Sequence, residues 1–315
     1  MSHPSTDTDG GLVSTVSDTV FRLNQFIRQR QNGSATAQLS IGLAMFLLFG
    51  SSIAIIVFYS FLRQAPPQGA YEFTFQNYRE FLANGFYRVV LWDSLVIAVK
   101  STLGALLFGY PVAYFLAFTE SDRKNLLLLL IILPFWINLV IRTYAWRLIL
   151  GNKGIINWFL VDILGVLNSP ANLLFSQNSI VLGLLHIFLP YMILPIYVSL
   201  DNIDRSHIEA AQNLGANNAQ AFYEVTLPQS IPGVAAGVVL SFVLGFGAFV
   251  VPLLLGGTQN LMIANTIGST FIELFNWSLG SAIAISVTVF VLAFVFIFNS
   301  IVGLEELYDD GGSAQ

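Results

Sequence analysis

A chain of 315 residues of which 55% are hydrophobic and only 10% are charged lacks the composition of a soluble domain, where about a quarter of the residues carry charge. The absence of cysteine excludes disulfides, zinc–thiolate sites and thiol chemistry, and a formal net charge of −5, concentrated at the termini, says little about partners. No G-x-x-x-x-G-K-[ST] motif occurs, so the chain does not bind ATP through a P-loop of its own. The composition predicts an all-α integral membrane protein.

The N-terminal tail, residues 1–36, is polar and has no apolar core of the kind that a signal peptide needs. Apolar residues recur in it at helical spacing and arginines flank them, which predicts an amphipathic helix on the membrane surface. A tail without regular structure is the alternative. The repeating apolar residues are Leu12, Val16, Val20, Leu23 and Ile27.

Six stretches are long and apolar enough to cross a bilayer, because a spanning helix needs roughly 20 mostly apolar residues. The apolar runs are continuous and do not alternate with polar residues, which argues against the strands of a β-barrel. The spans are expected at residues 38–62, 93–118, 125–150, 179–200, 232–256 and 279–303.

A transmembrane domain is therefore expected over residues 37–304, followed by a C-terminal tail at 305–315. Basic residues near the span ends predict its orientation. Arginines precede the first span, Arg123 and Lys124 lie between the second and third, and Arg205 lies between the fourth and fifth, which assigns this face and both termini to the cytoplasm. The bias is modest, because the opposite face carries Arg63, Arg79, Arg88 and Lys153.

Two segments of the outer face are expected to hold short helices. One is an amphipathic helix within residues 63–92, and the other lies around Ile155 to Leu164. Both would cover the outer mouth, where a periplasmic partner would rest. The apolar anchors of the first are Tyr78, Phe81, Leu82 and Phe86.

The third span contains a proline and several polar or ionisable residues, in the run L-P-F-W-I-N-L-V-I-R-T-Y-A-W. Pro134 is expected to kink the helix and to free a backbone carbonyl. Polar and ionisable groups inside a span are costly, so they are expected to face a cavity or a neighbouring helix. The residues concerned are Trp136, Asn138, Arg142, Tyr144 and Trp146.

The fourth and fifth spans offer less specific signals. His186 is expected to be a core histidine bonded to a backbone carbonyl, although an intramembrane hydrolase using His186 with Ser179, Ser199 or a serine of another span is an alternative. Neither spacing makes a convincing dyad, and no G-x-S-x-G elbow occurs. Glycines spaced along the fifth span allow close helix approach, and Pro252 near its outer end is a candidate gate hinge.

The loop over residues 201–231 is a polar island between two spans, and it has the pattern of a helical hairpin. Ser206 and Glu209 have the spacing of a capping box, which predicts a helix start. Gly215 is placed to end that helix, since glycine accepts positive φ. Asn217 or Asn218 is expected to cap a second helix.

The hairpin must bury an apolar stripe formed by Ile208, Ala211 and Leu214, and the second helix is expected to end at Leu227-Pro228. Because Arg205 is the only basic residue in the loop, adhesion to anionic lipid would be weak. A groove in another protein is the better partner.

This loop resembles the E-A-A-x3-G-x9-I-x-L-P signature of ABC importer permeases, with Val225 in place of the usual Ile. The resemblance implies the type I importer fold with six spans, in which the loop forms coupling helices that dock into a cytoplasmic ATPase. ATP would then be bound by that partner and this chain would need no cofactor or metal and would not be an enzyme. The matching residues are Glu209, Ala210, Ala211, Gly215, Val225, Leu227 and Pro228.

From residue 40 onward the chain is similar to the spermidine/putrescine type of these permeases. The similar segments include P-F-W and R-T-Y-A-W of the third span, G-N-K-G-I-I-N at 151–157 and F-G-A-F-V-V-P-L-L-L-G-G at 246–257. The resemblance implies a bacterial inner-membrane complex with a second homologous permease, two ATPase copies and a periplasmic or extracellular substrate-binding protein. Polyamine would be the substrate.

A polycation path should offer carboxylates or aromatic faces. Lys100 and Arg142 argue against a strongly anionic path. A permease of the same class for an opine, ferric iron or sulfate, and a passive channel, remain alternatives. The expected path residues are Trp136, Asn138, Tyr144, Trp146, Phe249, Asp93 and Glu273.

Overall fold

The structure is a computed structural model that describes residues 42–65, 71–120 and 123–302. The chain divides into two compact units, Met1–Phe58 and Tyr59–Gln315. The described part of the first unit is helical and belongs to a helix over Gly42–Ser60. The expected N-terminal amphipathic helix and the C-terminal tail lie outside the described residues.

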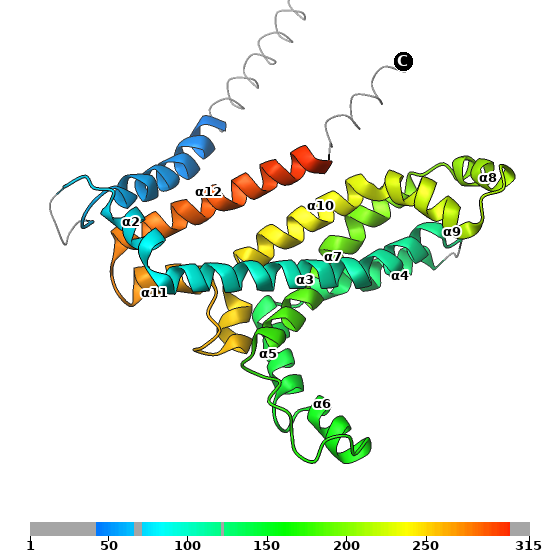
Figure 1. Cartoon of the computed structure of the whole chain (residues 1–315), viewed down its shortest axis with the longest axis horizontal. Coiled ribbons are helices and arrows are strands. Elements are labelled where there is room, and N and C mark those ends of the chain that lie inside the picture. The colour runs from blue at the N-terminus through cyan, green and yellow to red at the C-terminus, as the bar shows by residue number, and fades with distance from the viewer. Residues whose placement is uncertain (1–41, 66–70, 121–122, 303–315) are drawn as a thin grey trace, which may run out of the picture. The chain divides into compact units, whose positions relative to one another are not determined.

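Three long helices form the centre of the second unit. They are α3 (Gly85–Phe118), α7 (Gln177–Asp201) and α10 (Leu227–Phe246), which pack along one another (Figure 1). A fourth long helix, α12 (Trp277–Val302), joins α10 through stacked phenylalanine rings. All four are continuous apolar helices, so their backbone groups bond internally and apolar side chains can face lipid.

Short helices occupy the two ends of this bundle (Figure 1). At one end lie α2 (Gln76–Ala83) and α11 (Ile263–Ile272), and at the other lie α8 (Arg205–Asn213) and α9 (Asn218–Ala221). The two ends therefore correspond to the two faces that the sequence distinguishes, with the hairpin at one of them.

Close contact between α7 and α10 depends on glycine. A Cβ built on Gly233 would lie 2.5 Å from the carbonyl oxygen of Pro195, 2.6 Å from the Cβ of Ser199 and 3.0 Å from the Cα of Ile196. Two of these atoms belong to the backbone and cannot yield as a flexible side chain would. The absence of a side chain at Gly233 thus sets how closely these two helices approach.

We expect Gly233→Leu to destabilise the bundle by about 1–3 kcal/mol or more, because an inserted side chain must push the helices apart. Thermal unfolding in detergent would measure the loss. Gly247→Ala is the matched control, since the nearest atom to its Cβ lies 3.5 Å away. Equal stability of the two variants would contradict the inferred role of Gly233.

The third expected span, 125–150, is broken and not merely kinked. It consists of α4 (Lys124–Ile132), a 3₁₀ turn η1 (Leu133–Trp136) and α5 (Leu139–Leu150). The two halves, Lys124–Trp136 and Leu139–Ile163, are bent by 93°. Pro134 lies in the first turn of η1, where its missing N–H is tolerated, and extended backbone at 137–138 completes the break.

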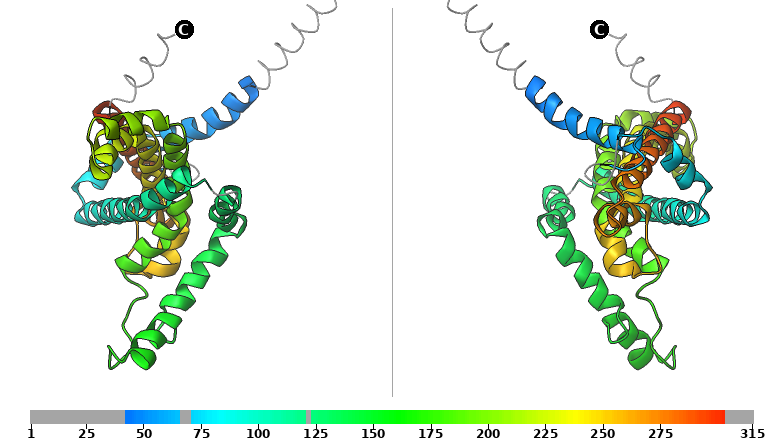
Figure 2. Two further views of the ribbon diagram at one scale, coloured as in Figure 1. Left: turned by 90° about the vertical axis from the view of Figure 1, so that its right-hand side faces the viewer. Right: turned by 90° about the vertical axis from the view of Figure 1, so that its left-hand side faces the viewer.

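Beyond this break the chain leaves the bundle. The helices α5 and α6 (Ile155–Trp158), followed by a π-helical turn η2 (Phe159–Ile163), project away from the three central helices (Figure 2). The short helix expected around residues 155–164 is therefore confirmed. With the broken pair counted as one span, the described residues provide six membrane-spanning segments, in agreement with the predicted all-α membrane fold.

The fifth expected span, 232–256, is wrong at both ends. Its helix begins at Asn218 and runs without a stop to Phe246. The prolines at the start do not end it, because the π-helical turn η3 (Phe222–Thr226) shifts the hydrogen-bond register before Pro228. At the other end the chain unwinds at residues 247–249 before the π-helical turn η4 (Pro252–Gly256).

The other span ends differ less. The second expected span, 93–118, begins eight residues early, at Gly85, so that Phe86 lies in α3 and not in the amphipathic helix before it. The Asn84 side chain starts α3 by accepting a hydrogen bond from the Phe86 N–H at 3.0 Å. The fourth and sixth spans, expected at 179–200 and 279–303, correspond to α7 and α12.

Candidate functional site: a membrane cavity and a helical hairpin

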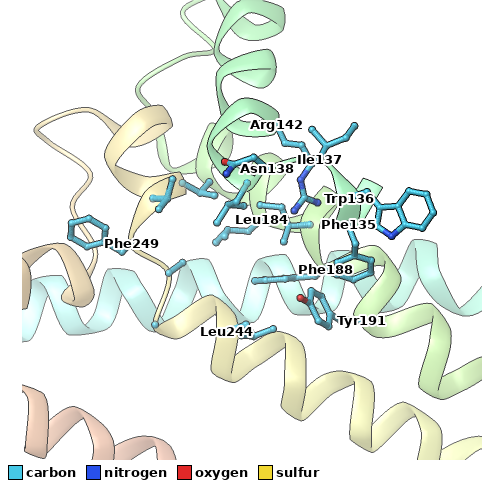
Figure 3. A pocket seen from close by; sticks show the side chains of 16 residues that line it. Phe135, Trp136, Ile137, Asn138, Arg142, Leu184, Phe188, Tyr191, Leu244 and Phe249 are labelled. Atoms are coloured by element: carbon cyan, nitrogen blue, oxygen red, sulfur yellow. The ribbon is translucent and has the colours of Figure 1, made fainter. Parts of the chain in front are cut away.

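A cavity of about 640 Å³ lies at the two helix breaks (Figure 3). Its walls come from η1 and the start of α5, from the middle of α7, and from residues 244–251 at the end of α10. The bend of the third span and the unwinding after α10 thus meet at the same place. Broken helices are tolerated within a membrane when the freed backbone lines such a cavity.

Aromatic rings form much of the cavity wall. Phe135 of η1 meets Tyr191 of α7 edge to face, with ring centroids 4.8 Å apart and an interplanar angle of 90°. On α7 the lining residues Leu184, Ile187, Phe188 and Tyr191 follow the i, i+3, i+4, i+7 spacing of one helix face. Sequence reasoning missed this face, although the spacing could have revealed it.

The cavity carries one charged side chain among the described residues that line it, Arg142. Its Nε is buried and has no hydrogen-bond partner within the described part of the chain. Asn138, also in the wall, caps α5 by accepting a hydrogen bond from the Val140 N–H at 2.8 Å. The described lining includes no carboxylate, so negative potential must come from elsewhere.

Four helix ends adjoin the cavity. They are the C-terminal ends of η1, at Trp136, and of α10, at Phe246, and the N-termini of α5 and of the helical segment that begins at Val250 and leads into η4. A helix C-terminus carries a partial negative charge, worth about 0.3–1 kcal/mol to a cation at an exposed site, and a helix N-terminus carries a partial positive charge. The two C-termini favour a cation, and Arg142 and the two N-termini oppose it.

The structure brings together three of the seven expected path residues. Trp136, Asn138 and Phe249 line the cavity, with Trp136 at its edge and 77% exposed (Figure 3). Tyr144 is an exposed residue of α5 outside the cavity, and Trp146 packs edge-on against His186, with centroids 5.8 Å apart.

The two expected acids do not line this cavity. Asp93 is half-buried in the first third of α3, and Glu273 is exposed at the C-terminal end of α11. Neither is among the residues of the cavity wall. A contribution of Asp93 or Glu273 to a substrate path stays a prediction.

The geometry of His186 does not support a serine hydrolase. The Ser179 hydroxyl donates to the carbonyl of Leu255 at 2.9 Å, and that of Ser199 donates to the carbonyl of Gln229 at 3.1 Å. The Nδ1 of His186 is buried without a hydrogen-bond partner among the described residues, which also departs from the carbonyl bond expected for that atom. Neither serine is therefore aligned for activation by this histidine.

The first helix of the hairpin begins two residues earlier than its sequence suggests. Asp204, and not Ser206, caps α8, because its carboxylate accepts the Ser206 N–H at 2.9 Å and a charged acceptor suits a helix N-terminus. These bonds lower the pKa of the Asp204 carboxyl. Since the folded-state pKa is depressed, the cap is present at neutral pH and is lost only as the pH falls through that pKa.

The turn of the hairpin confirms the role expected for Gly215. Its φ is +98°, and the N–H of Ala216 bonds to the carbonyl of Ala211 while that of Gly215 bonds to the carbonyl of Gln212. This is the paired bonding of a Schellman motif. Asn217 then caps α9 in a reciprocal capping box with Gln220, with both bonds at 2.9 Å.

Ion pairs and rings attach the hairpin to the helices of the bundle. Arg205 at the start of α8 pairs with Glu120, which follows α3, and Lys124 at the start of α4 pairs with Asp201 at 2.5 Å. The Phe222 ring of η3 lies edge-on to two tyrosines of α3, with centroid distances of 6.0 Å and 5.7 Å. The hairpin is thus attached to α3 and is continuous in the chain with α7 and α10, while the Lys124–Asp201 pair joins α4 to the last residue of α7.

The far side of the hairpin exposes apolar surface. Leu214, expected on a buried stripe, is 90% exposed, and Tyr223 is 66% exposed. Ile208 alone of the expected stripe packs against the core. Of the signature residues Glu209, Ala210, Gly215 and Pro228 are exposed, and Ala211, Val225 and Leu227 are half-buried.

Comparisons with known proteins agree on one kind of molecule. Residues 105–305 match the family described as binding-protein-dependent transport system inner membrane component. Over 229 residues the chain is 39% identical to the spermidine/putrescine transport system permease protein PotB of Haemophilus influenzae, covering 73% of this chain and 79% of that protein.

Two solved structures have a similar fold. One is a bacterial ABC transporter involved in the import of the acidic polysaccharide alginate, with a TM-score of 0.70 and 17% identity over 89% of this chain and 98% of that chain. The other is a bacterial alginate ABC transporter in complex with an alginate pentasaccharide-bound periplasmic protein, with a TM-score of 0.69 and 17% identity over 86% of this chain and 94% of that chain.

Proposed function

The chain belongs to the family of binding-protein-dependent transport system inner membrane components and has the fold of an ABC importer permease, so it is a transport subunit and not an enzyme. From this premise we propose that it is the polyamine-translocating permease of an ATP-driven importer. The observation that carries the proposal is the hairpin at 205–228, which exposes apolar surface at Leu214 and Tyr223 and is attached to the end of α3 through the Arg205–Glu120 ion pair.

In this proposal a separate cytoplasmic ATPase, present in two copies, receives the hairpin in a groove. Leu214 and Tyr223 would lose their exposure to water there, and burial of an apolar side chain stabilises by about 1.5–3 kcal/mol. ATP would be bound by the ATPase alone. Closure of the ATPase dimer would move the hairpin. The Arg205–Glu120 pair would carry the movement to α3, and the Asp201–Lys124 pair would pass movement of the α7 end to α4.

Movement of the hairpin would reach the cavity, because the hairpin is continuous with one wall of the cavity. The helix that starts at Asn218 in the hairpin ends at Phe246 beside the cavity. A displacement of the hairpin would therefore shift the wall that contains the unwound residues 247–249. Nucleotide binding would thus select the outward-facing state by stabilising the closed ATPase.

Polyamine is the proposed substrate because the chain is 39% identical to a permease named for spermidine and putrescine. The cavity supports this assignment through ring faces at Phe135, Phe188 and Tyr191, since aromatic faces attract ammonium groups. Arg142 would limit how tightly this half of the path holds a polycation. Weak binding of the substrate suits a transport path, because the path must also release the substrate.

The proposed assembly includes a second homologous permease and a periplasmic or extracellular binding protein. A structural relative has been solved with such a periplasmic protein, which supports this part. Both termini would lie in the cytoplasm of a bacterial cell, on the face that carries the hairpin. The wall of the cavity that this chain leaves open would be supplied by the second permease.

The test is uptake by the whole complex reconstituted in proteoliposomes, with radiolabelled spermidine and putrescine outside and ATP inside. We expect uptake that requires both ATP and the binding protein. Uptake without ATP would identify a passive channel and overturn the proposal. Transport of only sulfate, ferric iron or an opine would leave the importer assignment and overturn the polyamine assignment.

A further inference from the structure

One cation of the long helix α3 forms no ion pair with the described residues. Lys100 is exposed on a mostly apolar face of α3, which it shares with the half-buried Asp93 seven residues earlier. It is neither part of the cavity wall nor part of the hairpin. Its exposed apolar neighbours on that face are Val89, Trp92, Val99, Leu103 and Leu107.

Lys100 lies level with the middle of the long helices, which corresponds to the centre of a bilayer that these helices would span. It lies about 22 Å from the start of α3 and about 27 Å from its end, at 1.5 Å per residue. A Cβ on Gly245 would lie 3.6 Å from the Cα of Ala98, and the next residue, Phe246, stacks on Phe290, midway along α12, at 5.3 Å. The hydrocarbon half-thickness is about 15 Å, which a four-carbon stem does not cover.

Among the described residues no acid forms an ion pair with Lys100. Asp93, the nearest acid in α3, is seven residues away, which is about 10 Å along the helix. The described helix over Gly42–Ser60 and the helix α12 contain no acid. The remaining acids of the spans, Asp162, Asp201 and Glu224, lie at their ends.

An ammonium group in this position is costly unless it is paired, and intramembrane charges normally face another protein segment or a water-filled cavity. A polycation path would be a poor environment, because Lys100 would repel the substrate. A helix of a second protein that carries a carboxylate at the same depth supplies both the missing charge and cover for the apolar face.

We propose that the face of α3 around Lys100 is a contact with the second permease, and that a carboxylate in a spanning helix of that subunit pairs with Lys100. This inference rests on the proposed function, since it takes the second permease as the partner. The pair would give specificity, because two copies of this chain would bring two lysines together without an acid. It thereby favours the mixed pair over a homodimer.

The first experiment compares Lys100→Met with Lys100→Arg in the full complex purified through a tag on this chain. Lys100→Met would leave the partner's carboxylate buried and unpaired, so we expect recovery of the second permease to fall about tenfold or more. Lys100→Arg keeps the charge and is expected to assemble. Unchanged or improved assembly of Lys100→Met would overturn the proposal, as would a change in substrate affinity with full assembly.

The second experiment places a benzophenone amino acid at Leu103, one turn from Lys100 on the same face. Crosslinking to a spanning helix of the second permease is expected, and mass spectrometry would identify the acid beside it. Reversing both charges, with Lys100→Glu and that acid changed to lysine, should restore assembly. Crosslinked products that contain lipid but no second permease would contradict the inference.

The two failures are distinguishable. A wild-type complex that contains no second permease, or that takes up no solute with ATP, would remove the proposed function itself. A complex that contains the second permease and transports polyamine, but shows no effect of Lys100→Met and no crosslink at Leu103, would remove only this contact.

Discussion

Gly215→Val is expected to lower the amount of polyamine imported per ATP hydrolysed by about tenfold or more, while the protein still inserts and assembles. The φ of +98° at Gly215 is unfavourable for any L residue, and a β-branched residue tolerates it least. The strain is of order 1–3 kcal/mol and falls on the turn that fixes α8 relative to α9. Uptake and phosphate release measured in the same proteoliposomes would give the ratio.

Steric effects do not complicate this variant, because a Cβ on Gly215 would meet no atom within 4 Å. Gly165→Val is the matched control: Gly165 also has positive φ, +60°, and open surroundings, but it lies after η2 and far from the hairpin in sequence. We expect it to keep the wild-type ratio. Wild-type coupling in Gly215→Val would contradict docking of this turn in the ATPase.

Tyr191→Ala is expected to raise the KM for spermidine uptake by about tenfold. The ring lines the cavity and supports Phe135 edge to face, so the substitution removes one ring face and disorients another. A cation–π contact contributes roughly 0.5–2 kcal/mol, and two such contacts account for an effect of this size. Initial uptake rates over a range of spermidine concentrations would measure it, and Tyr191→Phe should retain most of the affinity.

Tyr144→Ala distinguishes a substrate path through the cavity from the path expected from the sequence alone. Tyr144 was expected on the substrate path, but it is 48% exposed on α5 and outside the cavity. We expect its replacement to leave the KM close to that of the wild type. A large effect at Tyr144 with none at Tyr191 would move the path away from the cavity.

The hairpin was largely predictable because its signals are local. The left-handed turn at Gly215 follows from the residue itself, and Asn217 needed only a partner three positions along. The errors there arose where two local signals competed. Asp204 exceeds Ser206 as a cap because its carboxylate is charged, and the π-helical turn η3 carries the helix past Pro228.

The cavity was predictable only in part. Pro134 marked the break in the third span, but the 93° bend also involves the extended backbone at 137–138, which no proline dictates. Tyr144 and Trp146 are two positions apart on a helix, so their side chains point in nearly opposite directions. Sequence proximity therefore grouped residues that the fold separates, and it left out Phe188 and Tyr191 of another helix.

By itself the sequence determined the membrane class, the number of spans, the hairpin and the resemblance to importer permeases. These depend on composition, on apolar runs and on turn residues, which act over a few neighbouring positions. The tertiary structure decided which helix faces meet in the cavity, which ion pair attaches the hairpin to α3, and that Lys100 forms no ion pair with the described residues. Such facts depend on the packing of helices distant in sequence, which no local pattern encodes.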